Sequence, residues 1–220
     1  MGLPAIAPYS WNADADLGPS RVEWTVDPAR AVLLVHDMQE YFVGVFDRGD
    51  AHAQINAAIR NIAALKEAAA AAGIPVVYTA QPPNQDPAER ALLTDFWGAG
   101  LIDDGRERII GQLAPGLGDE VLTKWRYSAF AKSPLQEMLD TWGRDQLLIT
   151  GVYAHIGCLT TALDAFMRDV QPFLVADALA DFSLEDHEMA VRYAASRCAQ
   201  VHGTSTVLAG LGSAALAGAR

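Results

Sequence analysis

The sequence predicts an α/β domain in which helices cover both faces of a parallel sheet. Residues 147–152 form an apolar run without a charge, which is typical of a strand buried on both faces. Similar runs alternate with segments of helical spacing along the chain, and this alternation implies right-handed crossovers between parallel strands. With 220 residues, of which 51% are hydrophobic and 20% charged, the chain can bury a sizeable core as one domain.

The first part of the chain is predicted to contain an arm, two strands and a long helix. Residues 1–28 include several prolines, and we expect an irregular N-terminal arm that lies over the domain or a neighbouring subunit. The run ARAVLLVHDM predicts a strand that ends at Asp37. Isoleucines three and four positions apart predict a helix over residues 51–72, which Gly73 ends. Residues 74–81, IPVVYTAQ, are the second predicted strand.

A long connection leads from the second strand to the third. Residues 82–115 carry several glycines and prolines, with a short helical pattern at residues 89–96. A connection of this length is more often functional than incidental. The third predicted strand, in DEVLTKWRY, ends at Lys124. The helix in SPLQEMLDTWG then returns the chain to the apolar run, with Ser133 as its N-cap and Gly143 as its terminator.

The last third of the chain continues the alternation of helices and strands. It is predicted to contain a helix through Arg168, a strand over 171–179, a helix over 184–198 that Ser183 caps, and a short strand over 200–204. The small residues that follow are predicted to form a short flexible tail. The predicted organisation is an arm at 1–28, one domain at 29–208 and a tail at 209–220.

Charge and cysteine content narrow the classes of partner. A formal net charge of −11 argues against nucleic acid or an anionic membrane, but a local group of lysines and arginines can still bind a small anion.

The N-terminal residues show no secretory signal or membrane anchor, and Ile6 stands where myristoylation requires serine or threonine. Two cysteines, Cys158 and Cys198, are too few for a disulfide framework, which fits the reducing cytoplasm.

Three chemically active side chains follow predicted strands. Asp37, Lys124 and Cys158 each come at or just after a strand's carboxyl end, and in an open parallel sheet these ends converge at ligand sites. Cys158 also lies near a predicted helix N-terminus, where the helix dipole lowers the pKa of a thiol. Each residue has a structural alternative when taken singly: a turn acid, a solvated strand-end charge and a packed cysteine. Together the three favour a site at this edge.

The trio resembles that of the isochorismatase-like cysteine hydrolases, a broad family that includes nicotinamidases and N-carbamoyl amidohydrolases. Within this family the chain is most similar to the isochorismatases proper. The similarity spans roughly residues 24–207, and it is carried by the long strings LLVHDMQEYF, YTAQP, LTKWRYSAF, GVYAHIGC, VADALADFS and YAASR.

The resemblance implies a doubly wound fold with a six-stranded parallel sheet, assembly as a homodimer or higher homo-oligomer, and no cofactor. It also implies hydrolysis of a small anionic substrate, the vinyl ether isochorismate, to pyruvate and 2,3-dihydro-2,3-dihydroxybenzoate in siderophore or secondary-metabolite biosynthesis. Relatives in phenazine-type pathways instead cut 2-amino-2-deoxyisochorismate, which gives trans-2,3-dihydro-3-hydroxyanthranilate. Because those relatives often lack the cysteine, Cys158 favours isochorismate.

Two other functions stay open at this point. A cysteine amidohydrolase would use the Cys158 thiolate to attack an amide carbonyl. A catalytically silent module would bind a ligand without turnover.

Siderophore isochorismatases are often fused to an aryl carrier domain, but a carrier function is not expected here. GLGSAAL lacks the aspartate before its serine, and only about a dozen residues follow Leu208.

The resemblance also implies a role for each site residue. Asp37 is the general acid, and Lys124 is its partner and a contact for a carboxylate or the ether oxygen, whereas Cys158 is not needed for vinyl-ether hydrolysis. The expected substrate contacts are Gln81 and Arg90 as holders, the hydroxyls of Tyr127 and Tyr153, the backbone at Gly157, and the pocket walls Phe42 and Trp97. Arginine can grip a carboxylate bidentately, and aromatic walls exclude water. Alternatively, Phe42 and Trp97 are core residues and Arg90 pairs with a nearby acid.

The histidines indicate no metal site. Alternation along the first strand points His36 away from Asp37, so His36 is predicted to be packed and hydrogen-bonded. His155 lies in the turn before Cys158 and is expected to contact backbone or ligand. Nicotinamidases place an aspartate and two histidines around a metal after the second strand. Because AQPPNQDPAER has no histidine, no metal is expected.

Overall fold

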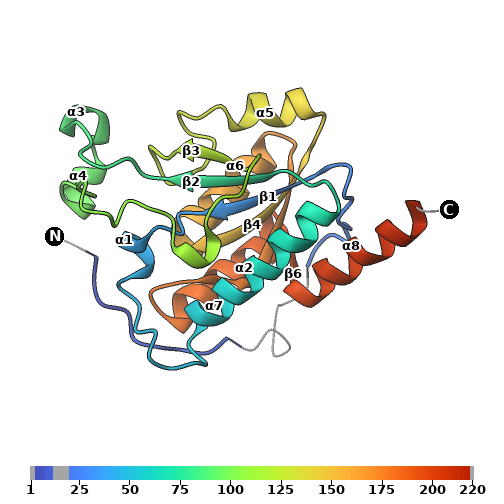
Figure 1. Cartoon of the computed structure of the whole chain (residues 1–220), viewed down its shortest axis with the longest axis horizontal. Coiled ribbons are helices and arrows are strands. Elements are labelled where there is room, and N and C mark those ends of the chain that lie inside the picture. The colour runs from blue at the N-terminus through green and yellow to red at the C-terminus, as the bar shows by residue number, and fades with distance from the viewer. Residues whose placement is uncertain (1–2, 12–19, 219–220) are drawn as a thin grey trace.

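A six-stranded parallel sheet forms the centre of the computed structural model, which describes residues 3–11 and 20–218 (Figure 1). The strand order is β3-β2-β1-β4-β5-β6. This arrangement confirms the predicted doubly wound α/β fold and its number of strands. The strands are β1 Ala31–His36, β2 Val76–Ala80, β3 Glu120–Thr123, β4 Gln146–Val152, β5 Gln171–Ala180 and β6 Gln200–His202.

Helices cover both faces of the sheet. On one face, α2 (Gln54–Ala71) and α8 (Thr204–Gly218) pack against Leu33 and Val35 of β1 and their neighbours. On the other face, α5 (Leu135–Trp142), α6 (Leu159–Met167) and α7 (Leu184–Arg197) pack against Val32 and Leu34. Successive side chains of β1 therefore enter two separate cores, which explains why the strand is apolar from Ala31 to Val35. Within the described ranges, no helix has an apolar stretch long enough to cross a membrane.

The shorter helices lie on the loops at the carboxyl ends of the strands. These are α1 (Glu40–Val43), α3 (Pro87–Arg90) and α4 (Leu93–Trp97), and a π-helical turn at Ala154–Cys158 leads into α6. The strand order reverses between the adjacent strands β1 and β4, because the chain leaves them in opposite directions along the sheet. Such a reversal opens a crevice at the carboxyl edge in which ligands bind.

The helix caps follow the sequence signals closely. The Ser183 hydroxyl accepts a hydrogen bond from Asp186 N–H at 3.1 Å and caps α7 as predicted. Gly143 adopts the left-handed conformation that ends α5. Ser133 lies one residue before the N-cap, Pro134, but its Oγ still accepts a hydrogen bond from Leu135 N–H at 3.3 Å.

The C-terminal segment differs from the prediction. β6 ends at His202 and α8 follows at Thr204–Gly218, so the segment predicted as a flexible tail is helical up to that residue. The backbone N–H of Thr204 donates to Asp177 Oδ1 at 2.7 Å, which fixes the start of the helix. Alanine-rich sequence is compatible with a helix, but the small residues give little amphipathic contrast by which to predict one. The last predicted tail residues, 219–220, lie outside the described residues.

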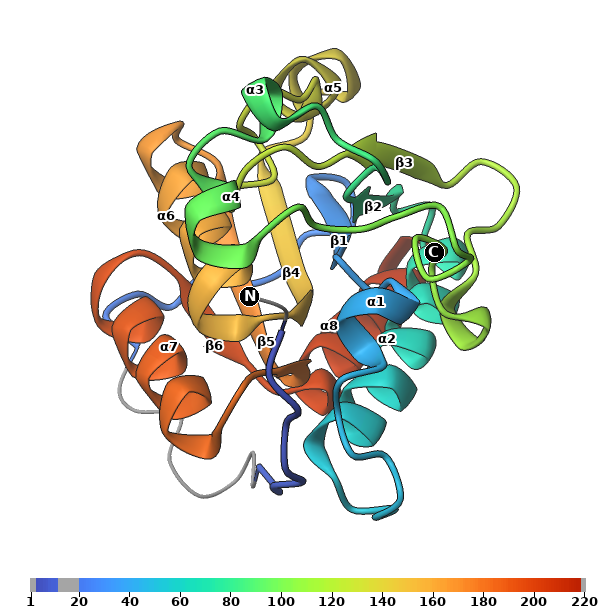
Figure 2. The same cartoon turned by 90° about the vertical axis from the view of Figure 1, so that its left-hand side faces the viewer.

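The described part of the N-terminal arm lies over the domain, one of its two predicted placements. Ile6 is 3% exposed and pairs with Phe46, and its N–H donates to Val45 O at 2.8 Å. Figure 2 shows this segment running across the carboxyl edge of the sheet, between α1 and α7. Residues 1–2 and 12–19 of the predicted arm lie outside the described residues.

Candidate active site

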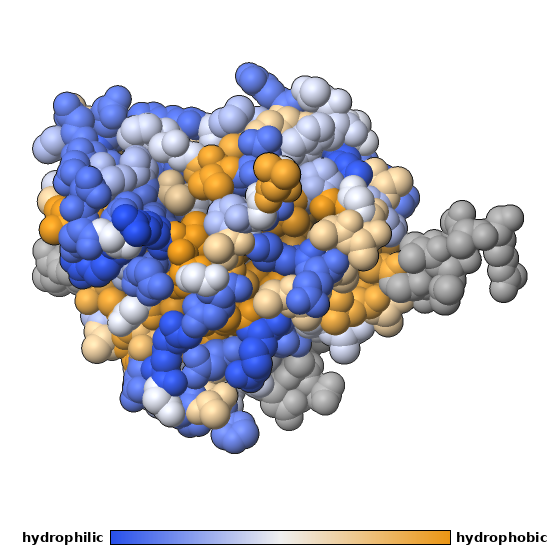
Figure 3. Space-filling view, in the orientation of Figure 1, coloured by the Kyte–Doolittle hydropathy of each residue, from blue (hydrophilic) through white to orange (hydrophobic). Residues whose placement is uncertain are grey.

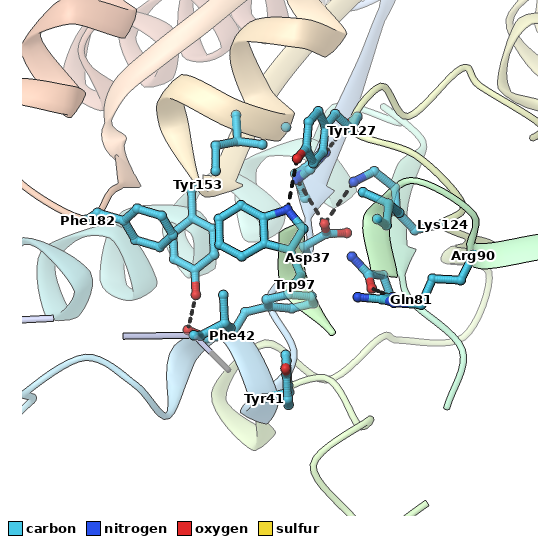
Figure 4. A pocket seen from close by; sticks show the side chains of 15 residues that line it. Asp37, Tyr41, Phe42, Gln81, Arg90, Trp97, Lys124, Tyr127, Tyr153 and Phe182 are labelled. Atoms are coloured by element: carbon cyan, nitrogen blue, oxygen red, sulfur yellow. Dashed lines mark hydrogen bonds and ion pairs between the residues drawn. The ribbon is translucent and has the colours of Figure 1, made fainter. Parts of the chain in front are cut away.

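A cavity opens at the carboxyl edge of the sheet, beside the reversal of strand order (Figure 4). Its atom-free space, counted together with the open mouth, is about 520 Å³. All the predicted site residues except Cys158 line it: Asp37, Phe42, Gln81, Arg90, Trp97, Lys124, Tyr127, Tyr153 and Gly157. The topology therefore brings together residues that are far apart in the sequence.

Asp37 and Lys124 form a buried ion pair at one wall of this cavity. Lys124 Nζ lies 2.8 Å from Asp37 Oδ2, and the two residues are 3% and 6% exposed. Thr79 of β2 donates its hydroxyl to Asp37 Oδ1 at 2.6 Å and accepts Asp37 N–H at 3.0 Å. The adjacent strands β1, β2 and β3 thus each position one residue of this group. Both oxygens of the Asp37 carboxylate have a hydrogen-bond partner.

The environment of Asp37 favours its ionised form when no ligand is present. Burial raises the pKa of the carboxyl group, but the charge of Lys124 and the hydrogen bonds from Lys124 and Thr79 lower it. The combined effect is a pKa below the usual value for aspartate. A proton donor role therefore requires a change of environment when substrate binds.

His36 is packed and hydrogen-bonded as predicted, but it does not point away from the site. It lines the cavity, and its Nδ1 lies 2.8 Å from Val152 O and 3.6 Å from Asp37 Oδ2. The alternation argument was wrong because β1 ends at His36 and Asp37 has a positive φ of 51°, which turns its side chain back. Burial lowers the pKa of His36 to about 4, so it is neutral near pH 7.

Gly157 makes a close contact that was not predicted. A Cβ atom at this position would lie 2.1 Å from the His36 imidazole, so the glycine makes room for that ring. The residue still lines the cavity, but the close approach that requires glycine is to His36 rather than to a ligand.

Arg90 is a buried cation beside the Asp37–Lys124 pair. It is 3% exposed, and its guanidinium donates to Gly98 O at 2.7 Å, to Gln85 Oε1 at 2.9 Å and to Gln81 Oε1 at 3.4 Å. Burial lowers its pKa. None of the ion pairs among the described residues involves Arg90, which contradicts the alternative that it pairs with a nearby acid.

Aromatic side chains form the opposite side of the cavity (Figure 4). Phe182 lies against Tyr153 with ring centroids 4.4 Å apart, and Trp97 lies 6.2 Å from Phe182. Trp97 Nε1 donates to Tyr127 Oη at 2.8 Å. The Tyr153 hydroxyl donates to Phe42 O at 3.0 Å, so it is not the free donor that was expected. Tyr153 and Phe42 thus serve mainly as walls.

Cys158 lies outside the cavity and is fully buried. Its Sγ lies 4.0 Å from Thr150 O, within the core that faces α6. Although Cys158 does precede α6, burial raises its pKa well above the usual value. The predicted lowering by the helix dipole is therefore wrong, because loss of solvation outweighs it. The thiol has neither the exposure nor the ionisation of a nucleophile.

Sequence reasoning missed several residues around the site. Gln39 is fully buried and binds both ends of the segment that carries Arg90 and Trp97. Its Oε1 accepts Gln81 N–H at 2.7 Å, and its Nε2 donates to Gln81 O at 2.9 Å and to Glu107 O at 2.6 Å. The sequence offered one signal for this role, which was the polar side chain of Gln39 two positions after Asp37.

The second missed group lies behind the aromatic wall. The Asp181 carboxylate accepts the backbone N–H groups of His155 and Phe182 at 2.6 and 2.9 Å, and its Oδ1 lies 2.6 Å from His155 Nδ1. Burial lowers the pKa of His155, but the hydrogen bond and charge of Asp181 raise it overall. The expected backbone contact of His155 is confirmed. Asp181 ends the apolar strand β5, the same signal that identified Asp37.

The remaining missed residues of the cavity lining are Leu3, Tyr41, Leu93, Ile156 and Phe182. In the part of the chain that the structure describes, no cluster of histidine, cysteine or acidic side chains could hold a metal ion.

The sheet topology and the paired carboxylate and ammonium at its carboxyl edge define an α/β enzyme domain. The sequence profile described as the Isochorismatase domain matches residues 31–206. The chain belongs to the isochorismatase family and is a hydrolase of that family.

Similar proteins are known in several bacteria. The chain is 54% identical to the isochorismatase of Bacillus subtilis and 49% identical to enterobactin synthase component B of Escherichia coli, over 209 residues or 94% of its length in both cases. It covers 66% and 73% of those two proteins. It is also 50% identical to the phenazine biosynthesis protein PhzD of Pseudomonas fluorescens, over 94% of this chain and 99% of that one.

The fold is also similar to solved structures of lower identity. A cysteine hydrolase from Pseudomonas syringae superimposes with a TM-score of 0.79 at 23% identity, over 90% of this chain and 99% of that one. This similarity concerns the fold alone.

Proposed function

We propose that this hydrolase cleaves the vinyl ether of isochorismate to pyruvate and 2,3-dihydro-2,3-dihydroxybenzoate. The observation that carries the proposal is a buried guanidinium, that of Arg90, in the same cavity as the Asp37–Lys124 pair. A buried cation without a carboxylate partner favours an anionic ligand, because an unpaired charge is costly away from water. Isochorismate supplies two carboxylates and an apolar ring.

The proposed reaction uses Asp37 as its acid. Asp37 gives a proton to the terminal methylene carbon, and the oxocarbenium ion that forms takes up water at the ether carbon. The resulting hemiketal expels the ring alcohol, which leaves pyruvate. One water is consumed, and the proton it releases restores Asp37.

Substrate binding supplies the change that Asp37 needs in order to act as an acid. The substrate carboxylates compete for the charge of Lys124 and repel a second negative charge nearby. The aromatic side chains beside the ring exclude water. Both effects raise the pKa of Asp37 in the complex above its value in the free protein.

A second candidate is hydrolysis of 2-amino-2-deoxyisochorismate by the same steps. It is favoured by the identity to PhzD, a phenazine biosynthesis protein that this chain covers almost completely. A cysteine amidohydrolase is disfavoured, because the buried Cys158 does not line the cavity.

The test compares both substrates under the same conditions. The purified protein is incubated with isochorismate and with its 2-amino analogue while pyruvate is measured, and ammonia release is measured with a panel of amides. We expect higher kcat/KM for isochorismate and no ammonia. Near-equal turnover, or a preference for the amino analogue, would reverse the order of substrates. Ammonia without pyruvate would replace the proposal with an amidohydrolase.

The proposed setting is siderophore or secondary-metabolite biosynthesis in the cytoplasm, with self-association as a homodimer or higher homo-oligomer. The buried free thiols of Cys158 and Cys198 fit a reducing compartment. Apolar surface gathers over the middle of the face in Figure 3, and Leu92, Phe96 and Met167 are largely exposed elsewhere, which supports an interface. Light scattering after size-exclusion chromatography measures the oligomeric state, and a monomer would contradict the proposed self-association.

A further inference from the structure

One wall of the cavity comes from the N-terminal arm, outside the residues that the family profile matches. Leu3 lines the cavity and packs against the cluster of buried side chains that includes Phe42 and Tyr153. The profile begins at residue 31. Figure 2 shows the arm crossing the carboxyl edge beside α1, so this wall belongs to the same edge as Asp37. A side chain outside the matched profile therefore lines the same cavity as Asp37.

The arm is held in place next to the cavity by backbone pairing. Ile6 N–H donates to Val45 O at 2.8 Å, and Asp47 N–H donates to Ile6 O at 2.9 Å. Both bonds connect the arm to the loop after α1, the helix that carries Phe42. Leu3 is three residues from this attachment, so its position relative to Phe42 is restricted.

Tyr9 provides a second, partly buried attachment. The Nε2 of His187 lies 3.0 Å from Ala176 O, a pure acceptor, so this nitrogen carries the proton in the neutral ring. Nδ1 of His187 therefore accepts the hydroxyl proton of Tyr9 at 2.9 Å. The same Tyr9 oxygen accepts Asp181 N–H at 2.7 Å. Trp11 stacks on His187 with ring centroids 4.4 Å apart.

Asp181 connects this attachment to the aromatic wall. Its carboxylate holds the backbone of His155 and Phe182, and Phe182 lines the cavity. The arm and the aromatic wall therefore share one support. A displacement of Tyr9 moves both Leu3 and the start of the segment that carries Phe182.

We propose that Leu3 is a specificity-determining residue that contacts the apolar ring of the substrate, and that Tyr9 is a positioning residue that acts through Leu3. The inference rests on the proposed function. It adds to it an apolar contact from the arm, opposite the cationic groups Lys124 and Arg90. The arm then selects for substrates whose uncharged side fits against it.

The first experiment measures kcat and KM for isochorismate in Leu3→Ala. Loss of part of a buried apolar side chain costs binding, and we expect KM to rise about three- to tenfold with kcat within about twofold. Leu117→Ala removes the same atoms from a fully exposed leucine and should change neither constant. An unchanged KM in Leu3→Ala would overturn the proposal for Leu3.

The second experiment separates positioning from general stability. Tyr9→Phe should raise KM with little effect on kcat, and its effect in the double variant Leu3→Ala/Tyr9→Phe should be smaller than in the wild type, because Tyr9 acts through Leu3. Full additivity of the two changes would overturn the positioning role. If Tyr9→Phe does not fold, the Leu3→Ala result still decides the main proposal.

The failure of this inference differs from that of the proposed function. If the wild type releases no pyruvate from isochorismate, the proposed function fails and the inference with it. If the wild type is active and Leu3→Ala matches Leu117→Ala, only the inference fails.

Discussion

Lys124 Nζ lies 2.8 Å from Asp37 Oδ2, and both residues are almost fully buried. The pair joins the end of β3 to the end of β1 across β2, whose Thr79 holds the other carboxylate oxygen. A buried pair of this kind is strongly affected by loss of either partner, because the remaining charge is then left without compensation.

Asp37→Asn keeps the shape of the side chain but cannot deliver an acidic proton. We expect kcat for isochorismate to fall at least about a hundredfold while substrate still binds, because general acid catalysis typically contributes on that scale or more. In the wild type, kcat should fall as pH rises through the raised pKa of the complex, since the acid is then ionised. A pH profile of both proteins measures this, and an asparagine variant within tenfold of wild type would exclude Asp37 as the acid.

Lys124→Ala should weaken substrate binding and turnover together. The ammonium orients Asp37 and faces an anionic substrate, and a charge-assisted hydrogen bond is worth about 1.5–3 kcal/mol, or roughly ten- to a hundredfold in kcat/KM. Steady-state kinetics measure the loss. Lys132→Ala, at an exposed lysine, is the matched control. A change below threefold in Lys124→Ala would contradict its placement in the site.

Cys158→Ala should keep most of the activity. Vinyl-ether hydrolysis forms no acyl-enzyme, and the buried thiol does not reach the cavity. Pyruvate release is the measurement, with Cys198→Ala as the control for loss of a buried thiol elsewhere. A thousandfold loss in a variant that remains folded would restore the covalent mechanism.

Gly100→Ala should displace Arg90. A Cβ atom there would lie 2.5 Å from Arg90 Nη1, at a residue with φ of 84°. We expect KM to rise, as it should in Arg90→Lys, which loses the bidentate fork. Gly105→Ala has a similar φ of 94° but meets no atom within 4 Å, so it controls for backbone strain alone. Equal KM values in the two glycine variants would argue against a role of Arg90 in binding.

Stability should fall as the pH is lowered from about 6.5 to about 4. Burial lowers the pKa of both His36 and His187 to about 4, so in this range the unfolded chain binds more protons than the folded one and acid favours unfolding. Asp37, whose pKa is also lowered, adds to the loss only below its usual value near 4.

Urea unfolding at several pH values measures this slope. His187→Gln should be less stable at pH 7 but should show a shallower slope, and His52→Gln, at an exposed histidine, should keep the wild-type slope. A wild-type stability that is constant between pH 6.5 and 4 would contradict the prediction.

The fold could be predicted from the sequence because each buried strand and each helix has a strong local pattern. β1 and β4 are buried along their whole length, and such apolar runs are typical of strands covered on both faces. α8 was missed because its small residues lack amphipathic contrast. The exact start of α5 was missed by one residue because Ser133 caps from outside the N-cap position.

The site could be located from the strand ends, but its contacts could not. The positive φ of Asp37 breaks the alternation that was used for His36. Burial raises the pKa of Cys158 more than the helix N-terminus lowers it, and burial depends on the whole fold. Leu3 joins the site only through long-range packing, which no local pattern encodes, whereas Asp181 carries the same strand-end signal as Asp37. The chemical roles of the lining residues remain predictions for the experiments above.

The clamp that Gln39 forms on the segment between Gln81 and Glu107 separates two tasks of the protein. Asp37 and Lys124 are attached to the rigid sheet, whereas Arg90 and Trp97 are attached to a loop that the clamp closes at its base. A surface loop that is held at its base tolerates changes of length and sequence between its ends. Substrate range in this scaffold can therefore evolve, or be engineered, by exchange of the loop as one cassette while the reaction centre stays unchanged.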